Sequence, residues 1–102
     1  MLKKLFTIVL LAFQLTIFAQ ESRLADVYYN DGEFEKAATL YKSLYEKNKQ
    51  IGLYFQRYTE CLLSLKAYKE AEYVIKKEIK SNPGDPQLRL SLAMVYDRIG
   101  DE

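Results

Sequence analysis

The chain has no histidine and only one cysteine, and these two absences remove several kinds of chemistry. Cys61 has no second cysteine with which to form an intramolecular disulfide, and no histidine is present to complete a zinc site or to activate a thiol. The sequence also shows no glycine-rich phosphate loop and no nucleophile–base pair. We therefore expect no enzyme activity, no cofactor and no metal, and we interpret Cys61 as a small, partly buried helix residue.

Residues that break helices are also scarce, because the 102 residues include two prolines and four glycines. Leucine, lysine, glutamate and alanine are plentiful, and these side chains lose little rotamer freedom in a helix. Hydrophobic residues make up 49% of the chain and charged residues 28%, which is the balance of a folded globular domain. The composition predicts one small all-α domain.

A strong charge of either sign is missing as well. The formal net charge is +1, and it becomes −1 if Lys3 and Lys4 are removed with the N-terminal segment. Nucleic-acid binding needs a basic surface that displaces counterions from phosphates, and this net charge does not supply one. We interpret the cluster of Lys76, Lys77 and Lys80 as solvated cations that suit the carboxyl end of a helix dipole, so we expect no nucleic-acid partner.

The first twenty residues, MLKKLFTIVLLAFQLTIFAQ, differ from the rest of the chain. Two lysines precede a 15-residue apolar run from Leu5 to Ala19, which is the layout of a secretory signal peptide. A bilayer-spanning helix takes about 20 mainly apolar residues, so we expect cleavage after Ala19 rather than retention as an uncleaved anchor. The Phe-Ala-Gln ending resembles exported proteins of Gram-negative bacteria. We expect the protein in the periplasm or cell envelope, or secreted.

Two segments of similar sequence, GEFEKAATLYKSLYEK at 32–47 and KAYKEAEYVIKKEIKS at 66–81, lie 34 residues apart. The same offset relates large apolar, small and turn positions elsewhere in the chain, and a period shared by so many positions predicts a structural repeat. The matched sets are Leu24, Tyr58 and Leu92; Ala25, Thr59 and Ala93; Tyr28, Leu62 and Tyr96; Gly32, Lys66 and Gly100; Phe34 and Tyr68; Ala37 and Ala71; Tyr41 and Ile75; Tyr45 and Ile79.

Each repeat is predicted to be a pair of helices. The apolar residues between Phe34 and Tyr45 recur at helical spacing, and a second such stripe lies on the preceding helix of the next unit, with KNKQIG as the break. Small residues at the matched positions would let helix axes approach to about 8–10 Å. The second stripe consists of Phe55, Tyr58, Thr59, Leu62 and Leu65, and the small residues are Ala25, Thr59, Ala93, Ala37 and Ala71.

Turn residues support these boundaries. Gly32 ends an Asn-Asp-Gly turn in which it can adopt a positive φ. Asp85 can cap a third helix by accepting backbone N–H bonds, and Pro86 fits the first turn of that helix, which should run to about Ile99.

This pattern resembles the tetratricopeptide repeat (TPR) family, whose 34-residue helix pair has a Leu/aromatic, small, aromatic series followed by Gly-x-aromatic-x-x-Ala. Lys66 stands at the usual glycine turn position, and Thr59 replaces the usual glycine or alanine. The resemblance implies an all-α fold of antiparallel helical hairpins stacked as a right-handed α-solenoid of about two and a half repeats. The expected divisions are a signal peptide at 1–19, repeats at 20–51 and 52–85, and the first helix of an incomplete repeat at 86–102. The carriers are Leu24, Ala25, Tyr28, Gly32, Phe34, Ala37, Tyr41, Phe55, Tyr58, Leu62, Tyr68, Ala71, Pro83, Leu92, Ala93, Tyr96 and Gly100.

The resemblance further implies that exposed side chains of the stacked first helices line a groove for a peptide or protein partner. Members that hold a chaperone's C-terminal carboxylate use Lys and Asn at the positions of Ser22, Asp26 and Asn30, and only Asn30 matches, so we expect no carboxylate clamp. We interpret the carboxylates of these helices as solvated rather than catalytic. The expected lining is Ser22, Asp26, Tyr29, Asn30, Gln56, Glu60, Leu63, Ser64, Leu90, Met94, Asp97 and Arg98. Among the tyrosines, we expect Tyr28, Tyr41, Tyr45 and Tyr58 in the core and Tyr29, Tyr54 and Tyr73 to be exposed.

The third unit stops at RIGDE, where the family pattern continues with a second helix. We therefore expect the 102 residues to be the N-terminal part of a longer protein, with an uncovered third-helix stripe that favours self-association. Two functions agree with this pattern: an exported protein–protein interaction scaffold, or the N-terminal repeat module of a larger envelope enzyme or sensor whose activity lies beyond residue 102. The uncovered stripe is Leu88, Leu92, Tyr96 and Ile99.

Overall fold

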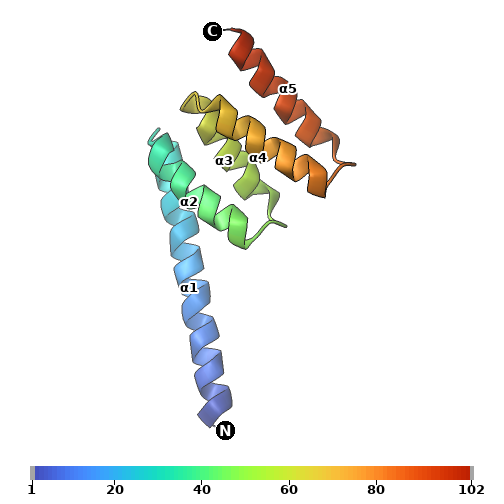
Figure 1. Cartoon of the computed structure of the whole chain (residues 1–102). Helices are drawn as coiled ribbons and strands as arrows, with labels where there is room; N and C mark the ends of the chain where they lie inside the picture. Colours follow the sequence, from blue (N-terminus) through green and yellow to red (C-terminus); the bar gives the residue numbers. More distant parts are fainter. Residues whose placement is uncertain (1, 102) are drawn as a thin grey trace.

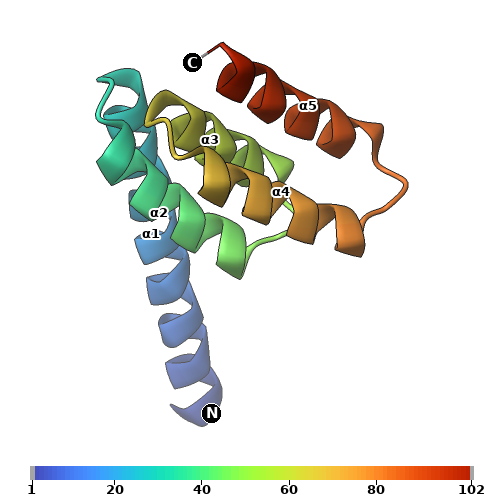
Figure 2. The same cartoon turned by 45° about the horizontal axis from the view of Figure 1, so that its top comes forward.

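The computed structural model describes residues 2–101, and within that range it contains five α-helices (Figure 1). Each helix packs against the next one in the chain, which confirms the predicted all-α class. The molecule measures 61 × 33 × 16 Å because the N-terminal half of the first helix extends beyond the others (Figures 1 and 2). The helices are α1 (Leu2–Asn30), α2 (Phe34–Lys47), α3 (Gly52–Ser64), α4 (Tyr68–Ser81) and α5 (Pro86–Gly100).

The helix boundaries follow from local chemistry at several turns. The Asp85 side chain accepts a 3.0 Å hydrogen bond from the backbone N–H of Gln87, and Pro86 occupies the first turn of α5, as the sequence predicts. Gly32, between α1 and α2, has a φ of 78°. Lys66, between α3 and α4, has a φ of 59°, an uncommon left-handed conformation for a residue with a Cβ.

The α1–α2 and α3–α4 turns close with the same pair of backbone hydrogen bonds. In the first turn, Gly32 N–H donates to the Tyr29 carbonyl at 3.2 Å and Glu33 N–H to the Tyr28 carbonyl at 2.9 Å. In the second turn, the corresponding bonds run from Lys66 to Leu63 at 3.1 Å and from Ala67 to Leu62 at 2.8 Å. The chain therefore makes the same reversal twice, although one copy lacks the glycine that favours it.

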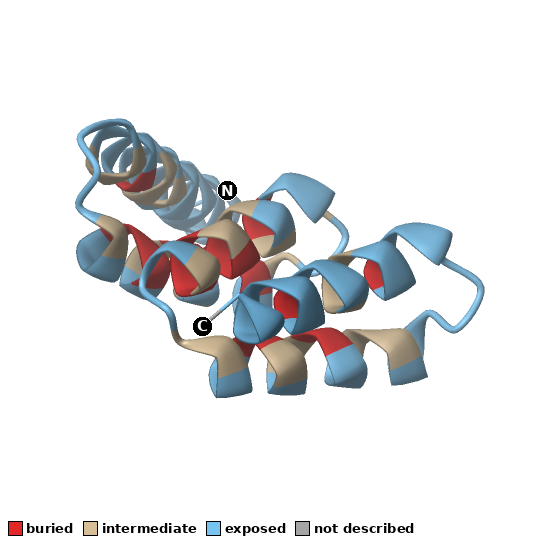
Figure 3. Cartoon of the chain, turned by 90° about the horizontal axis from the view of Figure 1, so that it is seen from above, coloured by how far each residue is buried: buried red, intermediate tan, exposed pale blue. Residues whose placement is uncertain are grey.

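The core lies where the helices face one another, with buried residues on the inner faces and exposed residues outside (Figure 3). Ala37 and Ala71 are fully buried, in agreement with the prediction that small side chains occupy helix contacts. Cys61 is fully rather than partly buried, and burial, assisted by the charge of Glu60, raises the pKa of its thiol to about 11. The thiol is therefore protonated and enclosed at neutral pH.

The apolar N-terminal part of α1, from Leu2 to Ile17, is exposed to solvent. This helix is long and apolar enough to cross a membrane by length and composition, and an N-terminal signal sequence has the same properties. The helix continues without a break past Ala19 to Asn30. Phe18 is the first of its side chains to pack against the core, where its ring lies edge-on to Tyr54 with centroids 6.0 Å apart.

Several burial predictions were wrong, for identifiable reasons. Tyr54 was predicted to be exposed, but it is buried, with 7% of its surface exposed, because Phe18 and Ser22 of α1 lie against it. Tyr29 is half-buried, and Leu65 is exposed because α3 ends at the residue before it.

On α5, the expected stripe is rotated slightly. Val95 is fully buried and Leu88 is also buried, whereas Tyr96 and Ile99 are exposed. The face of α5 that packs against α4 therefore includes Leu88 and Val95. The sequence predicted that Leu88 would be uncovered, and this prediction was wrong.

Candidate functional site

A cleft of about 500 Å³ lies between α3 and α5. Its α3 wall includes Phe55, Thr59 and Leu63, and its α5 wall includes Leu90 and Met94. Leu90 is 56% exposed and Met94 48% exposed, so these two side chains present apolar surface to solvent at the cleft. Such an arrangement of apolar walls with a few polar groups is typical of a binding site.

Five of the nine partner-binding candidates from the sequence line this cleft, and four do not. Thr59, Phe55 and Ser91 also line it and were not predicted, although helical spacing places Thr59 on the same face as Gln56 and Glu60. The remaining lining residues are Gly52, Ile75, Asp85, Gln87 and Leu88. The five predicted lining residues are Gln56, Glu60, Leu63, Leu90 and Met94; the four outside are Asp26, Tyr29, Asn30 and Asp97.

The residues outside the cleft occupy other places. Asp26 accepts a hydrogen bond from the Tyr41 hydroxyl of α2, so its carboxylate ties α1 to α2. Asn30 and Asp97 are exposed at the ends of α1 and α5. Tyr29 lies outside the cleft but reaches from α1 to a residue that lines it.

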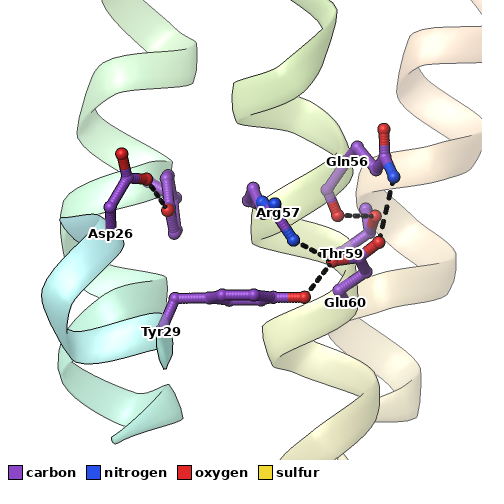
Figure 4. A network of polar contacts seen from close by, with 7 residues as sticks. Asp26, Tyr29, Gln56, Arg57, Thr59 and Glu60 are labelled. Carbon is purple, nitrogen blue, oxygen red and sulfur yellow. Dashed lines mark hydrogen bonds and ion pairs between the residues drawn. The ribbon is translucent and has the colours of Figure 1, made fainter. Parts of the chain in front are cut away.

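That residue is Glu60, whose carboxylate is the centre of a polar network (Figure 4). The Tyr29 hydroxyl donates to Glu60 Oε2 at 2.6 Å, and Gln56 Nε2 donates to Oε1 at 3.0 Å. Arg57 Nη1 lies 3.3 Å from Oε2, while the Arg57 guanidinium stacks 4.2 Å from the centroid of the Tyr29 ring. The network fixes the carboxylate between α1 and the cleft.

The network also sets the ionisation of its members. Burial acts to raise the pKa of Glu60, but the hydrogen bonds from Tyr29 and Gln56 and the charge of Arg57 outweigh it, and the pKa lies below the ordinary glutamate value. The bond to Glu60, with some burial, raises the pKa of Tyr29. Glu60 is therefore an anion and Tyr29 a neutral hydrogen-bond donor at neutral pH.

Four further tyrosine–carboxylate bonds join helices away from the cleft. Tyr41 and Tyr45 of α2 donate to Asp26 of α1 and Glu78 of α4, and Tyr58 of α3 donates to Glu70 of α4 at 2.6 Å. The fourth, from Tyr96 of α5 to Glu72 of α4, is 3.0 Å long and exposed. Burial first, and then the bonded carboxylates, raise the pKa of Tyr41, Tyr45 and Tyr58. Two of these bonds, from Tyr58 and Tyr96, join the wall helices α3 and α5 to α4.

The cleft offers apolar surface and hydrogen-bonding groups to a ligand. Its lining combines apolar side chains with amides, hydroxyls and the carboxylates of Glu60 and Asp85. Within residues 2–101, no group of three or more His, Cys, Asp or Glu side chains is arranged to hold a metal ion. The arrangement can bury apolar groups of a ligand and can accept hydrogen bonds from it.

Comparison of this chain with protein-family models, with curated proteins and with solved structures finds no match.

Proposed function

We propose that the protein is an exported TPR-type interaction scaffold, and that it binds a peptide or protein segment in the cleft between α3 and α5. The observation that carries the proposal is the cleft itself, which lies between α3 and α5, two helices that begin 34 residues apart and that the proposed repeat makes equivalent. Its apolar side chains Leu90 and Met94 are exposed, although leucine and methionine are usually buried. A partner that covered them would remove this surface from water.

The repeat interpretation has independent support in the helix bounds. Both α2 and α4 are 14 residues long, and they begin at Phe34 and Tyr68, 34 residues apart. The turns before them share one hydrogen-bond pattern, and the residues with positive φ in those turns are also 34 apart. On this proposal α1, α3 and α5 are first helices and α2 and α4 are second helices. The packing of each helix against the next one in the chain is what a stack of hairpins in a right-handed solenoid requires.

The exposed apolar half of α1 supports the export part of the proposal. A solvent-exposed apolar helix at the N-terminus, with Lys3 and Lys4 in its first turn, suits recognition as a secretion signal. The partner is then another protein of the periplasm or cell envelope.

Selection from a displayed peptide library tests the function. The purified full chain, kept soluble in detergent micelles, is used to enrich binding peptides, whose affinities are then measured by fluorescence anisotropy. Leu90→Ala and Met94→Ala should each weaken binding by about tenfold, because each removes exposed apolar surface from the cleft without opening the core.

The matched control is Tyr73→Ala, which removes an exposed aromatic side chain from α4 outside the cleft. Binding should be unchanged in this variant. Equal losses in all three variants, or a library that yields no binding peptide, would contradict the proposed site.

A further inference from the structure

The charged groups of the cleft are of one sign. Glu60 and Asp85 line it, together with the uncharged amides of Gln56 and Gln87, and among residues 2–101 no lysine or arginine belongs to its lining. Glu60 is held ionised by the hydrogen bonds and the ion pair described above. Asp85 accepts the N–H of Gln87 as the cap of α5. An apolar cleft with only anionic charge in its lining favours a ligand that carries positive charge.

We propose that the cleft selects an extended apolar protein segment that carries lysine or arginine, a specificity that rests on the proposed function of the same cleft. The apolar side chains of the segment contact Leu63, Leu90 and Met94. Its cations lie beside the carboxylates of Glu60 and Asp85. An acidic segment would place like charges together in a partly desolvated site and would be rejected.

The two carboxylates are spaced for a short segment. Asp85 lies at the Gly52 end of α3, because both residues also line a second, adjoining hollow whose lining does not include Glu60. Eight residues separate Gly52 from Glu60 along α3, which is about 12 Å at the rise of an α-helix. An extended chain covers that length with about four residues. Two cations about four residues apart, with apolar side chains between them, therefore match the cleft.

Three cations near the cleft, Arg57, Lys49 and Arg89, are not among its lining residues. Arg89, four residues after Asp85 on α5, donates to the Pro83 carbonyl at 3.4 Å. Arg57 contacts Glu60 but stacks against the Tyr29 ring on the side of α1 (Figure 4). Lys49 lies in the adjoining hollow, where Glu78 and Asp85 are also present. They offset part of the negative charge, which limits the expected preference to a few-fold. The ionised Glu60 carboxylate has about four acceptor positions, and the three donors described leave one for a ligand.

Three capped pentapeptide libraries, whose two flanking residues are four positions apart, test the charge preference. Each has two leucines within a randomised centre, and the flanking residues are lysine in the first library, glutamine in the second and glutamate in the third. Binding to the full chain is measured by fluorescence anisotropy. The lysine library should bind about three- to fivefold more tightly than the glutamine library, and the glutamate library more weakly than both. The lysine preference should decrease as salt is added.

Two variants locate the preference. Glu60→Gln keeps the shape of the side chain and an acceptor for Tyr29, and Asp85→Asn keeps a good helix cap. Each should reduce the ratio of lysine-library to glutamine-library affinity, and both changes together should abolish the lysine preference. Glu35→Gln, on the exposed start of α2, is the control and should retain it.

The outcomes separate this inference from the proposed function. If the glutamine library binds and lysine gives no advantage, the cleft binds apolar segments but does not select cations, and the inference is overturned. A preference for glutamate, or a lysine preference that persists in the double variant, overturns it as well. If none of the libraries binds, the proposed function fails together with the inference.

Discussion

The substitution Tyr58→Phe tests whether tyrosine–carboxylate bonds stabilise the helix stack. It deletes one hydroxyl group from a side chain that is 2% exposed, and with it the 2.6 Å hydrogen bond to Glu70. Hydrogen bonds to charged groups contribute about 1.5–3 kcal/mol. The Glu70 side chain is about half exposed and lies 3.8 Å from Lys42, so water can replace the lost donor. We therefore expect a loss of about 1 kcal/mol of unfolding free energy, below the lower end of that range.

Thermal denaturation followed by circular dichroism measures this loss. For a domain of this size, 1 kcal/mol corresponds to a decrease in Tm of roughly 4–8 °C. The matched control is Tyr96→Phe, because Tyr96 makes the same type of bond to Glu72 but is 46% exposed, and its loss should change stability by less than about 0.5 kcal/mol. Equal changes in the two variants, or a more stable Tyr58→Phe protein, would refute the reasoning.

Four further predictions follow from the fold. Ala37→Trp and Ala71→Trp should each cost about 1–3 kcal/mol or more and lead to unfolding, since both sites are fully enclosed; unchanged denaturation curves would mean that the helix contacts are wrong. Lys66→Gly should add roughly 0.5–1 kcal/mol, because glycine adopts a φ of 59° without strain, and a decrease in Tm would contradict this. Mass spectrometry of the protein from the envelope fraction should show a chain beginning at Gln20, and an intact N-terminus would identify an anchor instead. Tyrosines whose pKa values are raised in the folded state keep their protons to higher pH than in the unfolded chain, so their contribution to stability is complete below pH of about 10 and is lost above it. The tyrosines concerned are Tyr41, Tyr45 and Tyr58. Ultraviolet titration should show that tyrosinate formation at these residues is coupled to unfolding in that alkaline range. Ionisation of all tyrosines without unfolding would contradict this stability contribution.

Features that depend on neighbours in the sequence could be predicted closely. The cap formed by Asp85 and the positive φ of Gly32 require only local chemistry, and the structure has both. Periodicity likewise predicts the helical stripe from Phe34 to Tyr45, which lies on α2, and the burial of Ala37 and Ala71, because one helical face must be apolar and small where two helices meet.

Features that depend on distant segments could not be predicted. Tyr54 was expected to be exposed from its own helix, but α1 continues back to Phe18 and covers it. The bond between Tyr29 and Glu60 joins residues 31 positions apart, and no spacing rule selects this pair from the other tyrosines and carboxylates. The rotation of α5, which buries Val95 and exposes Tyr96, is set by packing against α4.

The same distinction holds for the cleft. Residues on the exposed faces of α3 and α5 could be selected by helical position, and five of them line it. The predicted residues of α1 lie elsewhere because α1 contacts α3 through the Tyr29 and Tyr54 side chains, which occupy the space between the two helices. The cleft therefore forms only where α5 stands apart from α3.

Backbone amide chemical shifts, recorded while a lysine-flanked leucine peptide is added to the isotopically labelled full chain, test the central claim most directly. If the cleft between α3 and α5 is the binding site, the largest changes should occur at Gln56, Leu63 and Met94, and they should saturate together with one affinity. The exposed outer face of α4 around Tyr73 should be unaffected. Changes centred on that outer face, or the absence of saturable changes at the cleft, would contradict the account.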